Sequence, residues 1–191
     1  MEKDTIVNNK ILIIGGSAGS LEVLIEVFPK LHVIDNLAIV LILHRRSTED
    51  TMLEDLIKMK TDIPVKQIED KIRLQPGHVY VAPGDYHLLF EKNGLLSLDI
   101  SEKVHFSRPS IDVSFESAAD VYGKHLTGLL LSGANADGTK GLLAIKEAGG
   151  VIAVQKPETA EVSYMPHHAL VEAKPDYVLD VSEMADFIKS I

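Results

Sequence analysis

The sequence predicts an α/β fold, with three αβα layers built around a doubly wound, mostly parallel sheet. Four short segments are apolar on both faces, as expected for parallel strands that helices cover on both sides. Segments with helical periodicity alternate with them, which is the order that a doubly wound sheet requires. The chain has 191 residues, of which 46% are hydrophobic, so we expect a single domain over residues 1–191 with a substantial core. The four strand segments are residues 11–14, 37–43, 126–131 and 151–154.

Five segments have the apolar spacing of amphipathic helices. The first runs from Leu21 to Phe28, and Pro29 helps to end it. The second begins near residue 52, with Asp50 or Thr51 as its expected N-cap. The remaining helices are expected over residues 111–122, 138–148 and 182–191.

Residues 77–100 interrupt the alternation of strands and helices. Three short apolar runs, 79–81, 88–90 and 95–98, are separated by turn sequences. The second turn contains Asn93-Gly94, a strong signal for a two-residue hairpin. We therefore expect a small antiparallel patch, with a hairpin, at one edge of the sheet.

Composition excludes several classes of function. The net charge of −9 argues against nucleic acid and anionic membrane surfaces as partners. The absence of cysteine excludes disulfides, thiolate zinc sites and cysteine nucleophiles, and it fits a cytoplasmic protein. The longest apolar run, residues 37–43, is far shorter than the roughly 20 residues that cross a bilayer, and residues 1–9 do not resemble a signal peptide. We expect no direct membrane insertion.

Ser17 lies in a turn between the first strand and the first helix. The pattern Gly15-x-Ser17-x-Gly19 in that context is typical of a nucleophilic serine, because glycines permit the sharp turn and the helix N-terminus stabilises developing negative charge. A phosphate cradle or a plain tight turn has the same geometry. The glycine spacing matches neither the dinucleotide fingerprint nor the Walker A loop, which weakens a nucleotide-binding alternative.

His44 and Asp137 each follow a predicted parallel strand, as Ser17 does. Because such strand ends meet at one edge of a sheet, a Ser-His-Asp triad is geometrically possible. The chain order Ser, His, Asp differs from the Ser, Asp, His order of α/β-hydrolases, so that family is disfavoured. Asp137 is equally well placed to cap the helix that begins at Gly138. The adjacent His167-His168 pair is a weak metal candidate, and we expect no metal site.

Six motifs, in order along the chain, resemble the catalytic domain of the CheB-type chemotaxis protein-glutamate methylesterases. The resemblance covers residues 11–191, nearly the whole chain. Six motifs in this order, among them the segment Arg108-Pro109-Ser110-Ile111-Asp112 and the loop that carries Asp137, are far more specific than the serine loop alone. The matching segments are residues 14–20, 43–44, 77–87, 108–112, 131–138 and 155–170.

The resemblance implies roles for five residues. Ser17 corresponds to the nucleophile, His44 to the general base and acid, and Asp137 to the residue that orients His44. The backbone N–H groups of Ala18 and Ala134 correspond to the oxyanion donors. The implied substrate is a glutamate methyl ester on the cytoplasmic helices of a methylated chemoreceptor, and some family members also deamidate receptor glutamine. The implied mechanism needs no metal or organic cofactor.

Two departures from the family pattern affect these expectations. Family members commonly carry an N-terminal phosphorylatable receiver domain, and we expect this chain to be a stand-alone catalytic domain without one. Ser20 replaces a glycine that the family prefers, and we expect it to cap the following helix. The alternative function is a catalytically silent domain of the same fold that binds a receptor or another partner. An intact Ser17, His44 and Asp137 argue against that alternative.

Overall fold

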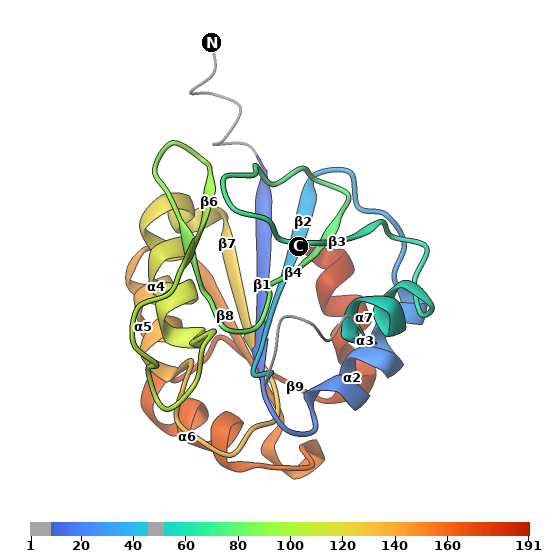
Figure 1. The fold of residues 1–191 in the computed structure, drawn as a ribbon. Coiled ribbons are helices and arrows are strands. Elements are labelled where there is room, and N and C mark those ends of the chain that lie inside the picture. Colours follow the sequence, from blue (N-terminus) through green and yellow to red (C-terminus); the bar gives the residue numbers. More distant parts are fainter. Residues whose placement is uncertain (1–8, 46–51) are drawn as a thin grey trace.

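Seven parallel strands form one sheet, in the order β3-β4-β2-β1-β7-β8-β9, in the computed structural model, which describes residues 9–45 and 52–191 (Figure 1). The central strand β1 pairs with β2 on one side and with β7 on the other. The strands are β1 (Lys10–Gly16), β2 (Leu37–Leu43), β3 (Val65–Gln67), β4 (Val79–Val81), β7 (Leu126–Leu130), β8 (Val151–Gln155) and β9 (Tyr177–Leu179). The doubly wound parallel sheet predicted from the apolar runs is confirmed.

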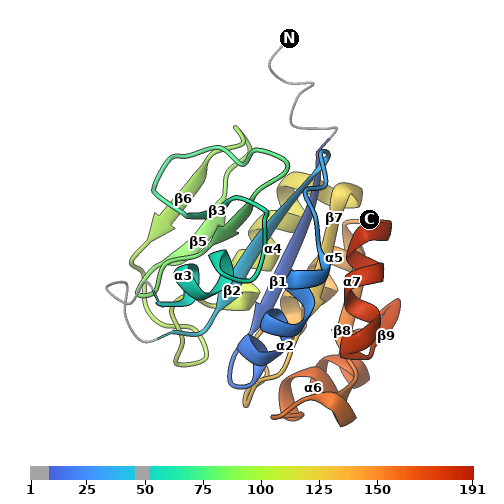
Figure 2. The same ribbon diagram turned by 90° about the vertical axis from the view of Figure 1, so that its right-hand side faces the viewer.

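Helices cover both faces of this sheet, and Figures 1 and 2 show the two layers on opposite sides of the strands. Alternate residues of β1 belong to different cores: Ile11 and Ile13 pack on one face, and Leu12 and Ile14 on the other. This two-residue period explains why the strand is apolar throughout. One layer contains α4 (Ile111–Tyr122), α5 (Thr139–Glu147) and α6 (Tyr164–Ala173), and the other contains α2 (Ser20–Val27), α3 (Met52–Lys58) and α7 (Val181–Ser190). Short 3₁₀ turns are η1 (Phe28–Lys30), η2 (Gly123–His125) and η3 (Pro157–Thr159).

The winding direction reverses between β1 and β7. Helix α2, which follows β1, lies on one face, whereas α5, which follows β7, lies on the other (Figure 1). In open α/β sheets, ligands bind beyond the carboxyl ends of the strands at such a switch point. The loops after β1 and β7 are the ones that contain Ser17 and Asp137.

The expected antiparallel hairpin is present as a separate two-stranded sheet. Strands β5 (His87–Phe90) and β6 (Leu96–Asp99) pair antiparallel, and Leu88 and Phe90 join the core beside α4. The expectation that residues 79–81 belong to this patch is wrong. Strand β4 pairs parallel with β2 and β3 inside the main sheet, where its three residues are buried.

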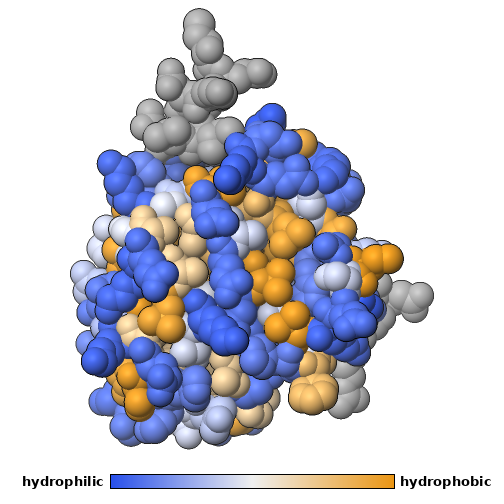
Figure 3. Space-filling view, turned by 90° about the vertical axis from the view of Figure 1, so that its left-hand side faces the viewer, coloured by the Kyte–Doolittle hydropathy of each residue, from blue (hydrophilic) through white to orange (hydrophobic). Residues whose placement is uncertain are grey.

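Two further features complete the description. The outer surface of the α4 and α5 side carries hydrophobic residues scattered among hydrophilic ones (Figure 3).

Within residues 9–45 and 52–191, no helix has the length and apolar character needed to cross a membrane. The predicted helix cap at Asp50 or Thr51 lies outside the described residues.

Close packing of α4 on α5 depends on a glycine. A Cβ on Gly141 would lie 2.4 Å from the Phe115 Cβ and 3.3 Å from the Asp112 Cα. We expect Gly141→Ala to lower the free energy of unfolding by about 1–3 kcal/mol, because overpacking outweighs alanine's better helix propensity. Urea denaturation measures this change. Lys140→Ala, at an exposed neighbouring position, is the control and is expected to change stability by less than about 0.5 kcal/mol.

Candidate active site

A pocket of about 500 Å³ opens beyond the carboxyl ends of β1 and β2. Ser17 directly follows β1 and His44 directly follows β2, as predicted. The last residues of these strands are paired, and the His44 N–H donates to the Gly16 carbonyl at 3.1 Å. Both side chains therefore start from neighbouring points and reach the same pocket. Its lining residues are Ser17, Ala18, His44, Arg45, Asp85, Lys103, Phe106, Ser107 and Arg108.

The turn that presents Ser17 is held by its own backbone. The Ser17 N–H donates to the Ser132 carbonyl at 2.9 Å, and the Ser17 carbonyl accepts from the Ser20 N–H at 3.1 Å. Gly19 is the N-cap of α2 with φ of 80°, a left-handed conformation that favours glycine. The expectation that Ser20 caps α2 is wrong, because Ser20 is the first helical residue and its hydroxyl donates to the Ser17 carbonyl.

His44 is in contact with Asp137. The His44 Nε2 lies 2.9 Å from the Asp137 Oδ2, and the Asp137 side chain is fully buried while that of His44 is 12% exposed. These residues are 93 positions apart in the sequence. The contact therefore joins the loops that follow β2 and β7 across the end of β1.

The carboxylate of Asp137 also caps α4. Its Oδ2 accepts from the Ile111 N–H at 2.7 Å, and its Oδ1 accepts from the Asp112 N–H at 2.9 Å and from the Ser110 hydroxyl at 3.0 Å. The alternative that Asp137 caps the helix after Gly138 is wrong. Gly138 itself is the N-cap of α5, with φ of 95°, and the hydrogen bonds of the Asp137 carboxylate go to α4, Ser110 and His44 instead.

These donors keep Asp137 ionised. Burial alone would raise its pKa, but the hydrogen bonds from His44 and from the backbone N–H groups of Asp112 and Ile111 outweigh burial and hold the pKa below its usual value. An ionised carboxylate only accepts hydrogen bonds. In the neutral form of the ring, His44 therefore carries its proton on Nε2 and keeps a lone pair on Nδ1.

Asp112 in turn binds the start of α5. Its Oδ1 accepts from the Gly138 N–H at 2.9 Å and from the Gly141 N–H at 2.8 Å. Burial and the negative charge of Asp137 raise the pKa of Asp112 to about 6, against the lowering effect of these two N–H groups. The start of each helix is thus bound by a carboxylate from the other segment: Asp137, just before α5, binds α4, and Asp112, in the first turn of α4, binds α5.

His105, Asp112 and Asp137 are close enough together to form a candidate metal site, with ligand atoms within 4.8 Å of one another. Each oxygen of Asp137 already accepts two hydrogen bonds, so a metal would have to displace a helix N–H or His44. The His105 Nε2 lies 3.3 Å from the Asp112 Oδ2. This arrangement fits an ion pair, formed when His105 is protonated, better than it fits a metal centre.

The two expected oxyanion donors lie beside Ser17. Ala18 is its neighbour, and a Cβ on Gly133 would lie 3.1 Å from the Ser17 Cβ, so the peptide that carries the Ala134 N–H passes next to the serine. Among the described residues, neither the Ala18 nor the Ala134 N–H donates a hydrogen bond. Both groups are therefore available to a ligand.

Ser132, which the sequence did not single out, fixes these two loops relative to each other. Its buried hydroxyl donates to the Ala18 carbonyl at 2.7 Å and accepts from the Val162 N–H at 2.9 Å. A sequence feature that could have identified Ser132 is its place in the motif of residues 131–138, as a small hydroxyl residue directly before Gly133.

Ser17 and His44 share the pocket without a hydrogen bond between their side chains, so far as the described residues show. The hydroxyl next to the free His44 nitrogen belongs to Ser107, whose Oγ lies 3.3 Å from Nδ1. The structure therefore brings His44 and Asp137 into contact and places Ser17 nearby. Sequence reasoning did not identify Ser107, because nothing in its local pattern indicates contact with a residue 63 positions away.

Arg45, the residue after His44, forms an ion pair with α3. Its guanidinium binds Glu54 through two contacts, at 2.6 and 3.3 Å, and both side chains are largely buried. This bidentate pair ties the residue after His44 to the first turn of α3. Arg108 also lines the pocket, and its guanidinium donates to the carbonyls of Ile100 and Ser101.

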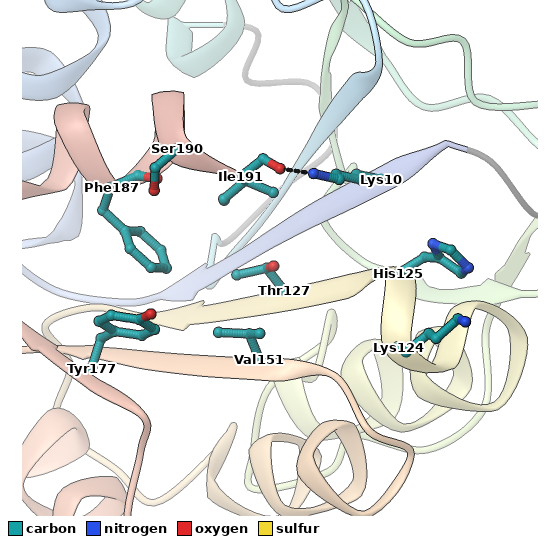
Figure 4. Close-up of a pocket in the computed structure, with 9 residues that line it drawn as sticks. All are labelled: Lys10, Lys124, His125, Thr127, Val151, Tyr177, Phe187, Ser190 and Ile191. Atoms are coloured by element: carbon teal, nitrogen blue, oxygen red, sulfur yellow. Dashed lines mark hydrogen bonds between the residues drawn. The ribbon is translucent and has the colours of Figure 1, made fainter.

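A second pocket, of about 250 Å³, lies at the opposite end of the sheet (Figure 4). It is formed where β1, β8 and β9 begin, and Lys10 donates there to the Ile191 carbonyl. None of the predicted site residues lines it. The candidate active site is therefore the pocket with Ser17 and His44.

Asp137→Asn tests how much the fold depends on the buried carboxylate. The amide keeps one oxygen but turns an N–H₂ group toward donors, so at least one buried donor loses its partner. We expect the free energy of unfolding to fall by about 2–4 kcal/mol, measured by chemical denaturation at pH 7. Asp186→Asn, on the exposed face of α7, is the matched control. Equal stability of both variants would contradict this role of Asp137.

Asp112→Asn tests the raised pKa. The folded protein holds the Asp112 proton more tightly than the unfolded chain, in which the carboxyl has its ordinary pKa of 3.8. The stability that this protonation contributes is therefore lost as the pH rises from about 4 through about 6. The amide oxygen still accepts from Gly138 and Gly141 without the charge. We expect the variant to gain stability relative to the wild type as the pH rises from 4 to 7, measured by thermal denaturation. A relative loss over that range would contradict the sign.

Comparisons of the sequence and the fold with known proteins identify the family of this chain. The family model described as CheB methylesterase matches residues 12–188. A relative from Leptospira interrogans is 41% identical over 179 residues, which are 94% of this chain and 93% of the relative. The protein-glutamate methylesterase/protein-glutamine glutaminase of Thermotoga maritima is 35% identical over 91% of this chain, which spans about half of that relative's length (51%). The crystal structure of the Thermotoga maritima CheB methylesterase catalytic domain superposes with a TM-score of 0.89 at 32% identity, covering 97% of this chain and 100% of the other. The chain belongs to the CheB methylesterase family.

Proposed function

We propose that this chain hydrolyses glutamate methyl esters on the cytoplasmic helices of methylated chemoreceptors, in the cytoplasm, through Ser17, His44 and Asp137. The observation that carries the proposal is the 2.9 Å contact between His44 and the buried carboxylate of Asp137, in the pocket that also contains Ser17. A histidine oriented by a buried carboxylate is the group that activates a serine hydroxyl. The substrate class follows the name of the Thermotoga maritima relative.

The proposed reaction uses the His44 Nδ1 as the base, because Asp137 occupies Nε2. Nδ1 takes the Ser17 hydroxyl proton as the serine oxygen bonds to the ester carbonyl carbon. The carbonyl oxygen becomes an oxyanion, which the N–H groups of Ala18 and Ala134 stabilise. The tetrahedral intermediate then expels methoxide, which receives the proton from His44 and leaves as methanol.

Water completes the cycle. It gives a proton to the His44 Nδ1 and attacks the acyl-enzyme. The second tetrahedral intermediate releases the glutamic acid side chain as Ser17 regains its proton from His44, and the acid then loses its own proton to solvent water to become the carboxylate. Asp137 remains ionised and stabilises the imidazolium in each half-reaction. Side chains and water account for every proton, so the proposed mechanism requires no metal or cofactor.

The same groups would act on a glutamine side chain. Its amide carbonyl is attacked in the same way, and His44 protonates the departing nitrogen so that ammonia leaves. We therefore include receptor glutamine deamidation in the proposal, in line with the glutaminase in the name of the Thermotoga maritima relative.

A catalytically silent partner-binding domain is the competing function, and the missing hydrogen bond between the described side chains of Ser17 and His44 favours it. Ser17→Ala separates the two functions. We expect methanol release from a methylated receptor fragment to fall by a factor of about 10³ or more, because the nucleophile is lost. Ser190→Ala, an exposed serine at the end of α7, is the control. Equal methanol release from Ser17→Ala and the wild type would contradict the esterase mechanism.

A further inference from the structure

The pocket that His44 lines also contains two serine residues, Ser17 and Ser107. Asp137 binds Nε2, so Nδ1 is the ring nitrogen left for the pocket. The Ser107 Oγ lies 3.3 Å from Nδ1 and 3.5 Å from the His105 carbonyl. In the neutral form of the ring Nδ1 carries a lone pair, so the Ser107 hydroxyl is then the donor in the shorter contact. A lone pair that accepts from Ser107 cannot accept the Ser17 proton at the same time.

We propose that Ser107 is a positioning residue that occupies the His44 Nδ1 in the unliganded enzyme and releases it to Ser17 when substrate enters the pocket. This inference rests on the proposed function, in which Ser17 attacks the ester. It explains why the structure contains the contact between His44 and Asp137 but no hydrogen bond between the described side chains of His44 and Ser17.

The segment that carries Ser107 is suited to move. Val104 and Ser107 form a two-residue hairpin, with N–H to carbonyl distances of 3.1 and 2.9 Å. The residues between them, His105 and Phe106, have φ of 49° and 62°, left-handed values that cost energy in residues other than glycine. Both are exposed, so a shift of the hairpin disturbs little packing beyond the 3.3 Å contact between the His105 Nε2 and the Asp112 Oδ2.

Phe106 links the hairpin to the substrate. Its side chain is 97% exposed and lines the pocket together with Ser17 and His44. A protein substrate whose ester side chain reaches Ser17 will press against this ring. Since Phe106 precedes Ser107 directly, displacement of the ring moves the hydroxyl away from Nδ1.

The first test uses a small ester, such as N-acetylglutamate γ-methyl ester, which offers little surface to Phe106. We expect Ser107→Ala to raise kcat/KM by about 2–10-fold, because one hydrogen bond no longer has to break. Ser107→Thr retains the hydroxyl and should behave as the wild type. A structural role for Ser107 predicts a lower or equal rate. An equal or lower rate in Ser107→Ala, with an unchanged melting temperature, would overturn the proposal, and Ser107→Gly provides the same test if the alanine variant does not fold.

The second test uses a methylated receptor fragment. We expect Phe106→Ala to lower kcat/KM by about 2–10-fold in the presence of Ser107 and to have little effect in a Ser107→Ala background. Equal losses in both backgrounds would show that Phe106 does not act through Ser107, which contradicts the proposal. Ser17→Ala should be inactive in both assays. Activity that survives Ser17→Ala would overturn the proposed function instead, so the two failures are distinguishable.

Discussion

The buried carboxylate of Asp137 is the interaction on which the rest of the site depends. It accepts hydrogen bonds from the first turn of α4, from the Ser110 hydroxyl and from His44. A buried charge is tolerated only when such donors surround it. One oxygen, Oδ2, serves both the Ile111 N–H and the His44 Nε2. The N-terminus of α4 therefore stabilises the negative charge of Asp137 and also holds its Oδ2 in the position where it contacts the His44 imidazole.

The position of Asp137 follows from the packing of two helices rather than from its own loop. Asp112, in the first turn of α4, binds the N–H groups at the start of α5, while Asp137, just before α5, binds those of α4. This exchange requires the two helix starts to lie close together, and Gly141 permits that approach beside Phe115. Burial, and to a lesser degree the nearby charge of Asp137, raises the pKa of Asp112, so its ionised form is held at some electrostatic cost. Core packing thus connects directly to the orientation of His44.

Sequence patterns predicted the features whose signal is local. Helix α4 was predicted to the residue, and the buried strands β1, β2, β7 and β8 were located by runs that are apolar on both faces. Strands β3 and β9 have three residues each and are largely exposed, so they show no such run, and the pairing direction of β4 depends on distant partners. Ser17, His44 and Asp137 were found because each follows a strand. The contacts of Asp137 with α4 and of Ser107 with His44 depend on packing between distant segments, which no local pattern indicates.

The two ring nitrogens of His44 have partners that differ in how far they can move. On the Nε2 side, Asp137 cannot move without leaving helix N–H groups unpaired in the interior, so we expect that contact to persist throughout the proposed reaction. On the Nδ1 side, the neighbouring hydroxyl belongs to Ser107 on an exposed hairpin, and Ser17 lines the same pocket; in the proposed mechanism a small shift exchanges the Ser107 hydrogen bond for one to Ser17. Any change between a resting and a reactive arrangement must therefore occur on the Nδ1 side. The Nε2 nitrogen of His44 thus takes part in the buried contact with Asp137, and in the proposed mechanism the Nδ1 nitrogen carries out the proton transfer.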